Sequence, residues 1–216
     1  MNFIFGASGF AREVDWLVDD IYRLKGIDYR TDYFVDNDDN CIESEINGKK
    51  VIPEIIFFNN YNKDNNNVII AIANSHIRLK IAEKIAANTN DTKFPVIVHP
   101  DARFDERSGK VSIGKGCIIC AGSVITTDIV IGKFVHININ CTIGHDSILE
   151  DYTTLSPSVS ISGNVFISRN SYLGTGAIVL PSVKICHDAV IGAGAVVSKN
   201  VDISGTYVGM PARKVR

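Results

Sequence analysis

Aliphatic residues occupy every sixth position over much of the second half of the chain. Read from Ile113, fifteen consecutive hexads run to Asp202 without an insertion or deletion, and each begins with an aliphatic residue. The fifth position of every hexad is small or β-branched. Such a fixed short period indicates a stacked solenoid in which each repeat contacts its neighbours.

We interpret one hexad as a short strand followed by a corner, so that three hexads form one triangular coil. The aliphatic first position then points into the prism, and the small fifth position suits a crowded corner. The fifteen hexads correspond to about five coils. A solenoid of this kind is a parallel β-helix.

The first half of the chain has a different pattern, in which strand-length apolar runs alternate with apolar residues at helical spacing. This pattern predicts strands at residues 2–5, 33–35, 68–73 and 95–98 and helices at residues 10–24 and 75–87. The alternation is typical of a small, mostly parallel Rossmann-like sheet. We therefore predict an α/β domain at residues 1–97, a β-helix at 98–203 and a C-terminal tail at 204–216.

Composition narrows the functional classes without naming one. The 216 residues carry a net charge of −2 and no basic cluster, which argues against a nucleic-acid partner. No apolar run approaches the ~20 residues of a membrane span, and the first residues lack the pattern of a signal peptide. We expect a cytoplasmic protein without a membrane partner.

The five cysteines predict packing rather than metal binding. Cys117 and Cys120 form a CxxC motif, but a single such pair is weak evidence for zinc. Cys117 and Cys141 also occupy fifth positions of hexads, where any small residue fits. We assign the same packing role to Cys41 and Cys186 and expect no metal.

Gly6–Gly9 connects the first predicted strand to the first helix. Backbone N–H groups at such a helix N-terminus can bind a phosphate. The turn lacks the full G-x-G-x-x-G pattern, so a dinucleotide is poorly supported, and a tight turn without a ligand is an equal alternative. Asp36 follows the second strand, where a carboxylate commonly holds a ribose or base, although it also suits a plain polar turn.

His145 and Asp146 are adjacent at the third and fourth positions of a hexad, which point outward. A histidine beside a carboxylate on a rigid coil can act as a general base, and an exposed polar pair is the alternative. Gly163 lies three hexads further on and leaves space above the histidine. In another column, Thr175 and Ala193 are flanked by glycines, where a thin ligand can lie against the backbone.

We assign the other histidines no catalytic role. His136 and His187 are expected to be solvated or corner residues, and His76 an exposed residue at the start of a helix. His99 is expected to stabilise the junction between the α/β domain and the coils.

An ordered set of motifs carries a resemblance to a known family. The motifs are Gly6–Gly9, Val35–Asp36, Ile70–Asn74 with Ile77–Arg78, Ile97–Pro100, Ile143–Asp146, Gly192–Val197 and Val208–Arg213. The chain resembles the sugar O-/N-acetyltransferases that join a small nucleotide-binding domain to a left-handed hexapeptide-repeat β-helix. The handedness follows from the resemblance and not from the spacing, since ordinary crossovers are right-handed.

The resemblance implies roles for individual residues. His145 is the expected general base and Asp146 its acidic partner, while Gly163, Thr175 and Ala193 are expected to contact acetyl-CoA. The residues expected to hold the nucleotide are Ser8, Gly9, Phe10, Asp36, Asn37 and Ala73. The family pattern further implies a homotrimer, with acetyl-CoA between neighbouring β-helices.

The implied reaction is N-acetylation of a nucleotide-linked 4-amino-4,6-dideoxyhexose by direct transfer from acetyl-CoA, in surface glycan or O-antigen biosynthesis. The nucleotide is UDP, dTDP or GDP. O-acetylation of a sugar or sialic acid, and a non-catalytic scaffold, are the alternatives. Three departures from the family pattern bear on the substrate: Phe10-Ala11 replaces a His-Gly pair, Thr154 a second histidine, and Ala73 a frequent glycine.

Overall fold

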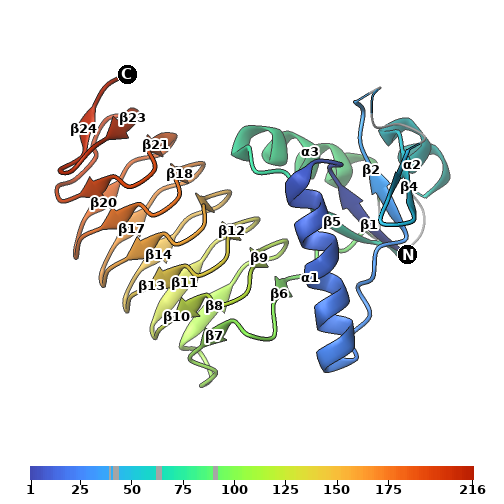
Figure 1. Ribbon diagram of the computed structural model, residues 1–216, viewed down its shortest axis with the longest axis horizontal. Helices are drawn as coiled ribbons and strands as arrows, with labels where there is room; N and C mark the ends of the chain where they lie inside the picture. Colours follow the sequence, from blue (N-terminus) through green and yellow to red (C-terminus); the bar gives the residue numbers. More distant parts are fainter. Residues whose placement is uncertain (39, 41–43, 62–64, 90–91) are drawn as a thin grey trace. The chain divides into compact units, whose positions relative to one another are not determined.

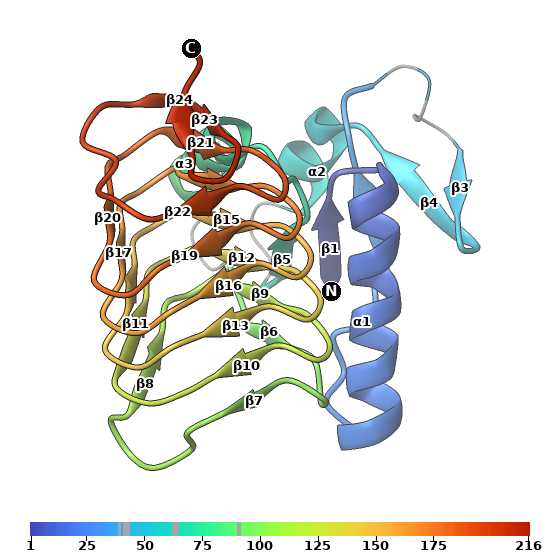
Figure 2. The same ribbon diagram turned by 60° about the vertical axis from the view of Figure 1, so that its left-hand side comes forward.

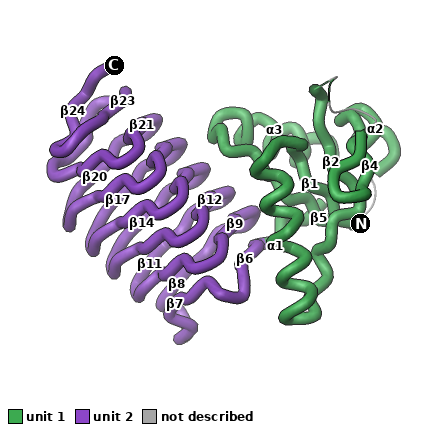
Figure 3. The backbone as a smooth tube through the Cα atoms, in the orientation of Figure 1, with its two compact units in different colours: residues 1–95 green, residues 96–216 purple. Residues whose placement is uncertain are grey.

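The computed structural model describes residues 1–38, 40, 44–61, 65–89 and 92–216, so Cys41 lies outside the described residues. The chain forms two compact units, residues 1–95 and 96–216 (Figures 1 and 3). In the part of the chain that is described, no helix has the length and apolar character needed to cross a membrane.

Unit 1 is an α/β domain built on a five-stranded sheet with the order β3-β4-β2-β1-β5. Its strands are β1 (Asn2–Phe5), β2 (Tyr33–Val35), β3 (Glu45–Ile46), β4 (Lys49–Ile52) and β5 (Asn67–Ile70), and its helices are α1 (Gly9–Lys25), α2 (Glu54–Asn60) and α3 (Ser75–Asn88). All pairings are parallel except that of β3 with β4. The predicted mostly parallel sheet is confirmed.

Apolar side chains on the helices explain why this sheet forms. The buried aliphatic residues of α1 are Ala11, Val14, Leu17, Val18 and Ile21, which recur at helical spacing. Phe57 of α2 packs edge-on against Phe3 and Phe5 of β1, with ring centroids 4.9 and 5.0 Å apart. Each such large side chain contributes roughly 1.5–3 kcal/mol when fully buried.

The β3–β4 hairpin is an element for which the sequence analysis made no prediction. Asn47 and Gly48 form its turn with φ angles of 51° and 74°, which is the left-handed region that Asn and Gly tolerate best. Asp15 on α1 is buried and accepts hydrogen bonds from Lys49 Nζ at 2.6 Å and Asn47 Nδ2 at 2.8 Å. A buried carboxylate of α1 therefore holds the hairpin.

Unit 2 is a left-handed parallel β-helix whose coils form three stacked sheets of six, five and eight strands (Figure 2). The six-stranded sheet contains β7 (Arg103–Phe104), β10 (Val124–Ile125), β13 (Thr142–Ile143), β16 (Ser160–Ile161), β19 (Ile178–Val179) and β22 (Val196–Val197). The five-stranded sheet contains β8 (Val111–Ile113), β11 (Ile129–Ile131), β14 (Ile148–Leu149), β17 (Phe166–Ile167) and β20 (Lys184–Ile185). The eight-stranded sheet contains β6 (Ile97–Val98), β9 (Ile118–Ile119), β12 (His136–Ile137), β15 (Thr154–Leu155), β18 (Tyr172–Leu173), β21 (Ala189–Ile191), β23 (Gly205–Val208) and β24 (Arg213–Lys214).

Paired residues in these sheets are three hexads apart, as Thr142 and Ser160 are, so the predicted coil of three hexads is confirmed. First positions of the hexads, such as Ile143 and Leu155, are buried in one continuous core. Fifth positions also point into this core, whereas the sequence analysis placed them at the corners. The corners are made by the fourth positions, where residues such as Asp146 have positive φ.

Small polar residues at fifth positions are accommodated by a repeated hydrogen bond. Ser123 Oγ donates to the Asn138 carbonyl at 3.0 Å, and Ser147 and Ser171 make the equivalent bond to the carbonyl 15 residues later. A buried hydroxyl without a partner is destabilising, and this bond removes that cost. Serine is thus compatible with the interior of the coil.

Both ends of the β-helix differ from the sequence-based interpretation. The strand expected to close the α/β sheet at residues 95–98 is wrongly assigned, because Ile97–Val98 forms β6 and pairs with β9 in the β-helix. The segment after residue 203 contains β23, which pairs with β21, and β24, which turns back along β23. Backbone hydrogen bonding thus continues beyond the hexads at both ends.

Candidate functional site

The residues expected to hold a nucleotide lie at one edge of the sheet in unit 1. Phe5 pairs with Val35 on one side and with Ile70 on the other, so the carboxyl ends of β1, β2 and β5 are neighbours. Ligands of open α/β sheets bind at this edge. Ser8, Gly9 and Phe10 follow β1, Asp36 and Asn37 follow β2, and Ala73 follows β5. The structure therefore brings all six to the same edge.

The turn after β1 has a strict requirement for glycine at its first position. Gly6 has φ of 111°, and a Cβ added there would lie 2.9 Å from the Ala71 carbonyl oxygen. Ser8 precedes α1 in an extended conformation, and its side chain makes no capping hydrogen bond to the helix. Ser8 and Gly9 are exposed, so the first turn of a 17-residue helix meets solvent here. Such helix N-termini favour anions.

Asp36 and Asn37 have structural partners within the domain. Asp36 accepts the Ala7 N–H on one carboxylate oxygen at 2.8 Å and the Asn37 N–H on the other at 2.7 Å. Asn37 Oδ1 accepts the backbone N–H of Glu54, at the start of α2, at 3.1 Å. Asp36 thus fixes the shape of the turn after β1, a role that the sequence analysis did not foresee.

Arg78 has a structural role that motif reading missed. Its side chain is fully buried, and Nη1 donates to the carbonyls of Ile72 at 2.7 Å and Ala73 at 3.1 Å. The guanidinium therefore holds the chain as it leaves β5 and positions the exposed Ala73. Ile77–Arg78 was among the motifs of the resemblance, but a buried role is not predictable from an arginine on an amphipathic helix.

Each corner of the β-helix joins two of its sheets, and the predicted residues divide between corners. The His145 corner joins β13 to β14 and carries His145, Asp146 and Gly163. The Thr175 corner joins β18 to β19 and carries Thr175 and Ala193. The His187 corner joins β20 to β21. Within one chain, the expected catalytic pair and part of the expected acetyl-CoA contacts are on different corners.

His145 and Asp146 form a short side-chain hydrogen bond. Nδ1 of His145 lies 2.7 Å from Oδ2 of Asp146, and the two side chains are 65% and 60% exposed. Asp146 has φ of 59°, so the left-handed corner turns its carboxylate back toward the preceding ring. With Nδ1 donating to the carboxylate, Nε2 is left as a proton acceptor, which is the arrangement of an oriented general base.

Gly163 lies against the imidazole on the adjacent coil. A Cβ added to Gly163 would lie 2.6 Å from His145 Nε2 and 2.7 Å from Cε1. Real atoms do not approach so closely, so any side chain at residue 163 displaces the ring. The sequence-based expectation that this glycine leaves room for His145 agrees with the geometry.

A second His–Asp pair reproduces the first in its internal geometry. His187 Nδ1 lies 2.7 Å from Asp188 Oδ2, and Asp188 has φ of 57°. The expectation that His187 is an exposed corner residue agrees with its 58% exposed side chain. The His187–Asp188 pair can therefore be compared directly with the His145–Asp146 pair.

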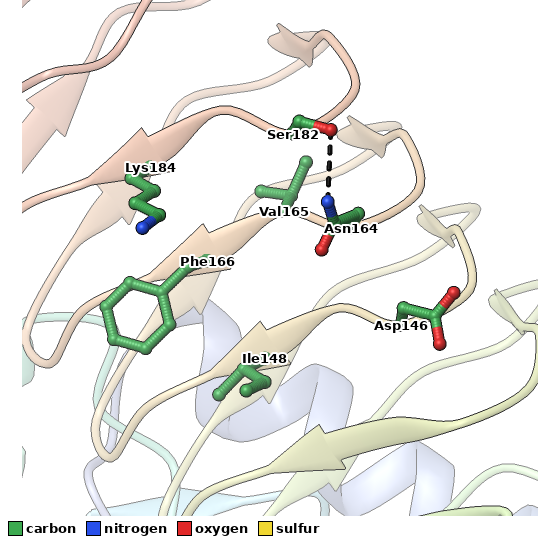
Figure 4. Close-up of a pocket in the computed structure, with 7 residues that line it drawn as sticks. All are labelled: Asp146, Ile148, Asn164, Val165, Phe166, Ser182 and Lys184. Carbon is green, nitrogen blue, oxygen red and sulfur yellow. Dashed lines mark hydrogen bonds between the residues drawn. The ribbon is translucent and has the colours of Figure 1, made fainter.

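A hollow of about 360 Å³ lies on the five-stranded sheet beside the His145 corner (Figure 4). We call it the Phe166 hollow. Its lining residues are Asp146, Ile148, Asn164, Val165, Phe166, Ser182 and Lys184. Asn164 Nδ2 donates to Ser182 Oγ at 3.1 Å on one wall, and Ile148 and Phe166 form the other (Figure 4). Asp146 therefore bonds to His145 and also lines this hollow.

The remaining histidines and cysteines have mostly structural environments. The expectation for His136 is wrong: its side chain is 2% exposed, although the sixth position of a hexad points away from the prism. His99 is buried and its Nδ1 accepts the Asp101 N–H at 3.0 Å, as expected for a junction residue. Burial raises the pKa of the Cys141 thiol to about 11, which removes it as a nucleophile near neutral pH.

The described residues contain no group of three or more histidine, cysteine or acidic side chains that is arranged to hold a metal ion.

Two family models match the chain. Residues 3–85 match the PglD N-terminal domain, and residues 111–127 and 159–199 match the hexapeptide repeat of succinyl-transferase. A GDP-perosamine N-acetyltransferase of Escherichia coli O157:H7 is 34% identical over 183 residues, which cover 83% of this chain and 78% of that protein.

Solved structures of similar proteins match the chain over nearly its full length. WeeI from Acinetobacter baumannii has a TM-score of 0.87 and 32% identity, covering 100% of this chain and 99% of that one. PerB from Caulobacter crescentus, solved in complex with CoA and GDP-perosamine, has a TM-score of 0.82 and 26% identity. That match covers 99% of this chain and 96% of PerB.

Proposed function

The chain belongs to the PglD-like family of hexapeptide-repeat sugar N-acetyltransferases, and on that premise we propose that it acetylates the 4-amino group of a nucleotide-linked 4-amino-4,6-dideoxyhexose. Acetyl-CoA is the donor in this family, and the enzyme class is that of an acetyl-CoA-dependent acyltransferase. The observation that carries the proposal is the His145–Asp146 pair, whose ring is accommodated by the absence of a side chain at Gly163.

In the proposed reaction the amine nitrogen attacks the carbonyl carbon of the thioester. His145 Nε2 accepts a proton from that nitrogen, and Asp146 stabilises the resulting imidazolium through Nδ1–H. The carbon–sulfur bond then breaks, CoA leaves as the thiolate, and the imidazolium returns the proton to sulfur. The products are the amide and free CoA, and the imidazole ends in its starting state.

Direct transfer is supported by the state of the cysteines. A covalent acetyl-cysteine intermediate requires a thiolate that is exposed to substrate. Cys117, Cys120 and Cys141 are buried, and Cys186 is half-buried with its pKa raised by burial. The four described cysteines are free thiols. The location that we propose for the enzyme is cytoplasmic.

We place acetyl-CoA along Gly163, Thr175 and Ala193. Thr175 and Ala193 are exposed and stack on successive coils, since Gly194 N–H donates to the Thr175 carbonyl at 2.9 Å. Small residues there let a thin chain approach the backbone. Since these two residues lie on a different corner from His145, a complete site needs a second β-helix, and a homotrimer supplies one by symmetry.

The nucleotide is assigned to the carboxyl edge of the sheet in the domain proposed at residues 1–97. The N-terminus of α1, where Ser8 and Gly9 are exposed and Phe10 is half-buried, suits a diphosphate. Asn37 and Ala73 flank this turn on the neighbouring strands, and Asp36 acts by holding the turn. The product is consistent with a biosynthetic role in surface glycan or O-antigen assembly.

A transfer assay tests the proposal directly. The purified enzyme is incubated with acetyl-CoA and a panel of 4-amino-4,6-dideoxyhexoses linked to UDP, dTDP or GDP, and release of free thiol is followed. Calorimetric titration with UDP, dTDP and GDP provides an independent readout. We expect one nucleotide to bind and its amino sugar to be acetylated. Turnover of hydroxyl sugars alone, or no binding of any nucleotide, contradicts the proposal.

A further inference from the structure

The β23–β24 hairpin and the segment before it form the far end of the β-helix (Figures 1 and 2). We call residues 198–216 the cap. Tyr207 and Ala212 of the hairpin pack against the core of the coils, and the Ala212 N–H donates to the Val196 carbonyl at 2.8 Å. The hairpin is therefore held firmly on the last coil, and its other side chains are free to face a partner.

The cap exposes several large apolar side chains. Met210 is 76% exposed, Ile203 64% and Val215 62%, which makes them three of the four most exposed large apolar side chains in the described residues. All three belong to one hairpin, since Tyr207 Oη donates to the Ile203 carbonyl at 2.8 Å and the Val215 N–H to the Thr206 carbonyl at 2.8 Å. Exposed apolar side chains that gather in one place indicate an interaction surface.

The cap is also basic, although the chain as a whole has a net charge of −2. It contains four basic residues and one acidic residue, which are Lys199, Arg213, Lys214, Arg216 and Asp202. Within the described ranges, none of the four basic side chains forms an ion pair with a carboxylate. Lys199, Arg213 and Lys214 line a hollow of about 320 Å³ that has no acidic residue in its lining. The charge of the cap therefore favours an anionic partner.

We infer that the cap binds the surface of an anionic lipid bilayer. Apolar side chains surrounded by basic ones are the composition of interfacial anchors: the apolar groups enter the boundary between headgroups and acyl chains, and the cations attract anionic lipids. The hollow at Lys199, Arg213 and Lys214 suits the phosphate of a headgroup. We expected no membrane partner from the sequence because no apolar run is long enough to span a bilayer, but surface binding needs no such run.

A threefold assembly strengthens such binding. In a ring of three copies, corresponding residues lie at the same height along the axis, so the homotrimer proposed above can present three caps to one flat surface. Each basic residue near an anionic bilayer raises the affinity about fivefold. Linked contacts reinforce one another, so a cap that binds weakly alone gives measurable binding in the trimer.

Flotation of the full chain with lipid vesicles tests the inference. We expect wild-type protein to bind vesicles of phosphatidylcholine and phosphatidylglycerol, but not vesicles of phosphatidylcholine alone, and to dissociate as the salt concentration rises. The double variant Arg213→Gln/Lys214→Gln should bind at least about 25-fold more weakly, at about fivefold for each charge. Lys25→Gln/Lys80→Gln is the matched control, because it removes the same number of charges from exposed positions on α1 and α3.

Tryptophan fluorescence locates the contact on the chain. The sequence has one tryptophan, Trp16 on α1, which is 62% exposed. A variant that combines Trp16→Phe with Met210→Trp carries its indole on the cap instead, at a position where a large side chain meets only solvent. We expect its emission to shift to shorter wavelength when phosphatidylglycerol vesicles are added, because an indole partitions into the bilayer interface. The emission of wild-type protein should stay unchanged.

Four results overturn the inference. If wild-type protein does not bind phosphatidylglycerol vesicles, an anionic bilayer is not the partner. Equal vesicle binding by Arg213→Gln/Lys214→Gln and its control excludes the cap as the contact. A shift in the emission of Trp16, without one in the variant with the indole at residue 210, places the contact in unit 1. A raised KM for acetyl-CoA in Arg213→Gln/Lys214→Gln, with vesicle binding unchanged, assigns these cations to the phosphates of the donor.

The proposed function is tested separately from this surface. The cap includes neither the His145–Asp146 pair nor Thr175 and Ala193, so its variants should keep the wild-type kcat in the transfer assay without vesicles. Failure of the wild type to transfer an acetyl group would contradict the proposed function and leave the lipid-binding surface in place. Failure to bind vesicles would contradict only the inference about the cap.

Discussion

The His145 corner and the His187 corner carry the same pair of residues in the same conformation. In both, histidine Nδ1 lies 2.7 Å from the carboxylate of a left-handed aspartate. They differ in the coil above. Gly163 stacks on His145 in the regular register of three hexads, whereas above His187 the register changes, since Ala189 pairs with Gly205. They also differ one coil below, where Thr127 occupies the column of His145 and Arg169 that of His187.

The comparison shows that an oriented histidine is insufficient to identify a catalytic base. The left-handed fourth position of a hexad turns any aspartate back toward the residue before it, so the hydrogen bond follows from the fold. Hollows border both corners, since Asp146 lines one and His187 lines another, so what distinguishes the His145 corner is Gly163, whose missing side chain leaves Nε2 facing bare backbone. Three experiments test this distinction, and a fourth tests direct transfer.

Loss of the imidazole is expected to have the largest effect. His145→Ala should lower kcat/KM by about 10²–10⁴-fold, because a general base contributes that much. A neutral amine needs less assistance than a hydroxyl, which favours the lower end of that range. His187→Ala should change kcat/KM by no more than about twofold. Equal losses in the two variants, with circular dichroism unchanged, contradict the assignment of the base.

Filling the space above the ring is expected to have the next largest effect. Gly163→Ala places a methyl group 2.6 Å from the present position of Nε2 and forces the imidazole to turn. A displacement of about 1 Å at a reacting group costs up to about 10²-fold in rate, so we expect a loss of tenfold or more. The double variant with His145→Ala should lose no more than His145→Ala alone. Additive losses mean that Gly163 acts independently of the ring.

Removing the charge of the acidic partner is expected to cost less. Asp146→Asn keeps the backbone, because asparagine tolerates positive φ at least as well as aspartate, and Asn164 and Asn170 occupy equivalent corner positions. We expect kcat to fall about tenfold. The hydrogen bond between the imidazolium and the carboxylate is exposed to solvent, and such a bond contributes less free energy than a buried one. Asp188→Asn is the matched control and should leave kcat unchanged. If both variants are fully active, the carboxylate has no role in the reaction.

Blocking the thiols is expected to have no effect on turnover. Burial raises the pKa of Cys141 to about 11, so its thiolate is scarce at neutral pH and becomes available only as the pH rises toward that value. Treatment with a maleimide at neutral pH should leave kcat unchanged, and mass spectrometry should find Cys141 unmodified. Inactivation that parallels modification of one cysteine supports a covalent intermediate instead.

Much of the β-helix was predictable because one pattern is repeated many times. The inward position of residues such as Ile143 and the register of three hexads both follow from the repeat. The left-handed corners were also visible in the sequence, as a fourth position rich in glycine, asparagine, aspartate and serine. The apolar residues define the six-residue period but do not locate the corner within it. The small residues at the fifth position therefore suggested the wrong place for the corner.

Individual polar residues were less predictable, because their partners come from distant parts of the chain. Asp36 was expected to contact a ligand, and the structure adds a bond that the sequence pattern does not predict, in which Asp36 accepts the Ala7 N–H from the turn after β1. The position of His136 indicates an outward side chain, but it carries no information on what covers that sheet. Arg78 is buried because the carbonyls that follow β5 need donors, a requirement that appears only once β5 and α3 are adjacent.

The register of three hexads has a consequence for how this scaffold tolerates changes of length. Insertion of a whole coil beyond Val197 lengthens the prism by about 4.8 Å and leaves every earlier column in place. Insertion of a single hexad between Gly163 and Thr175 keeps each inward residue inward, yet rotates the rest of the chain by one face. Thr175 and Ala193 then move to the same corner as His145. The fold therefore repeats in units of three hexads, and this repeat sets the separation between the column of Thr175 and Ala193, where we propose the donor, and the column of His145.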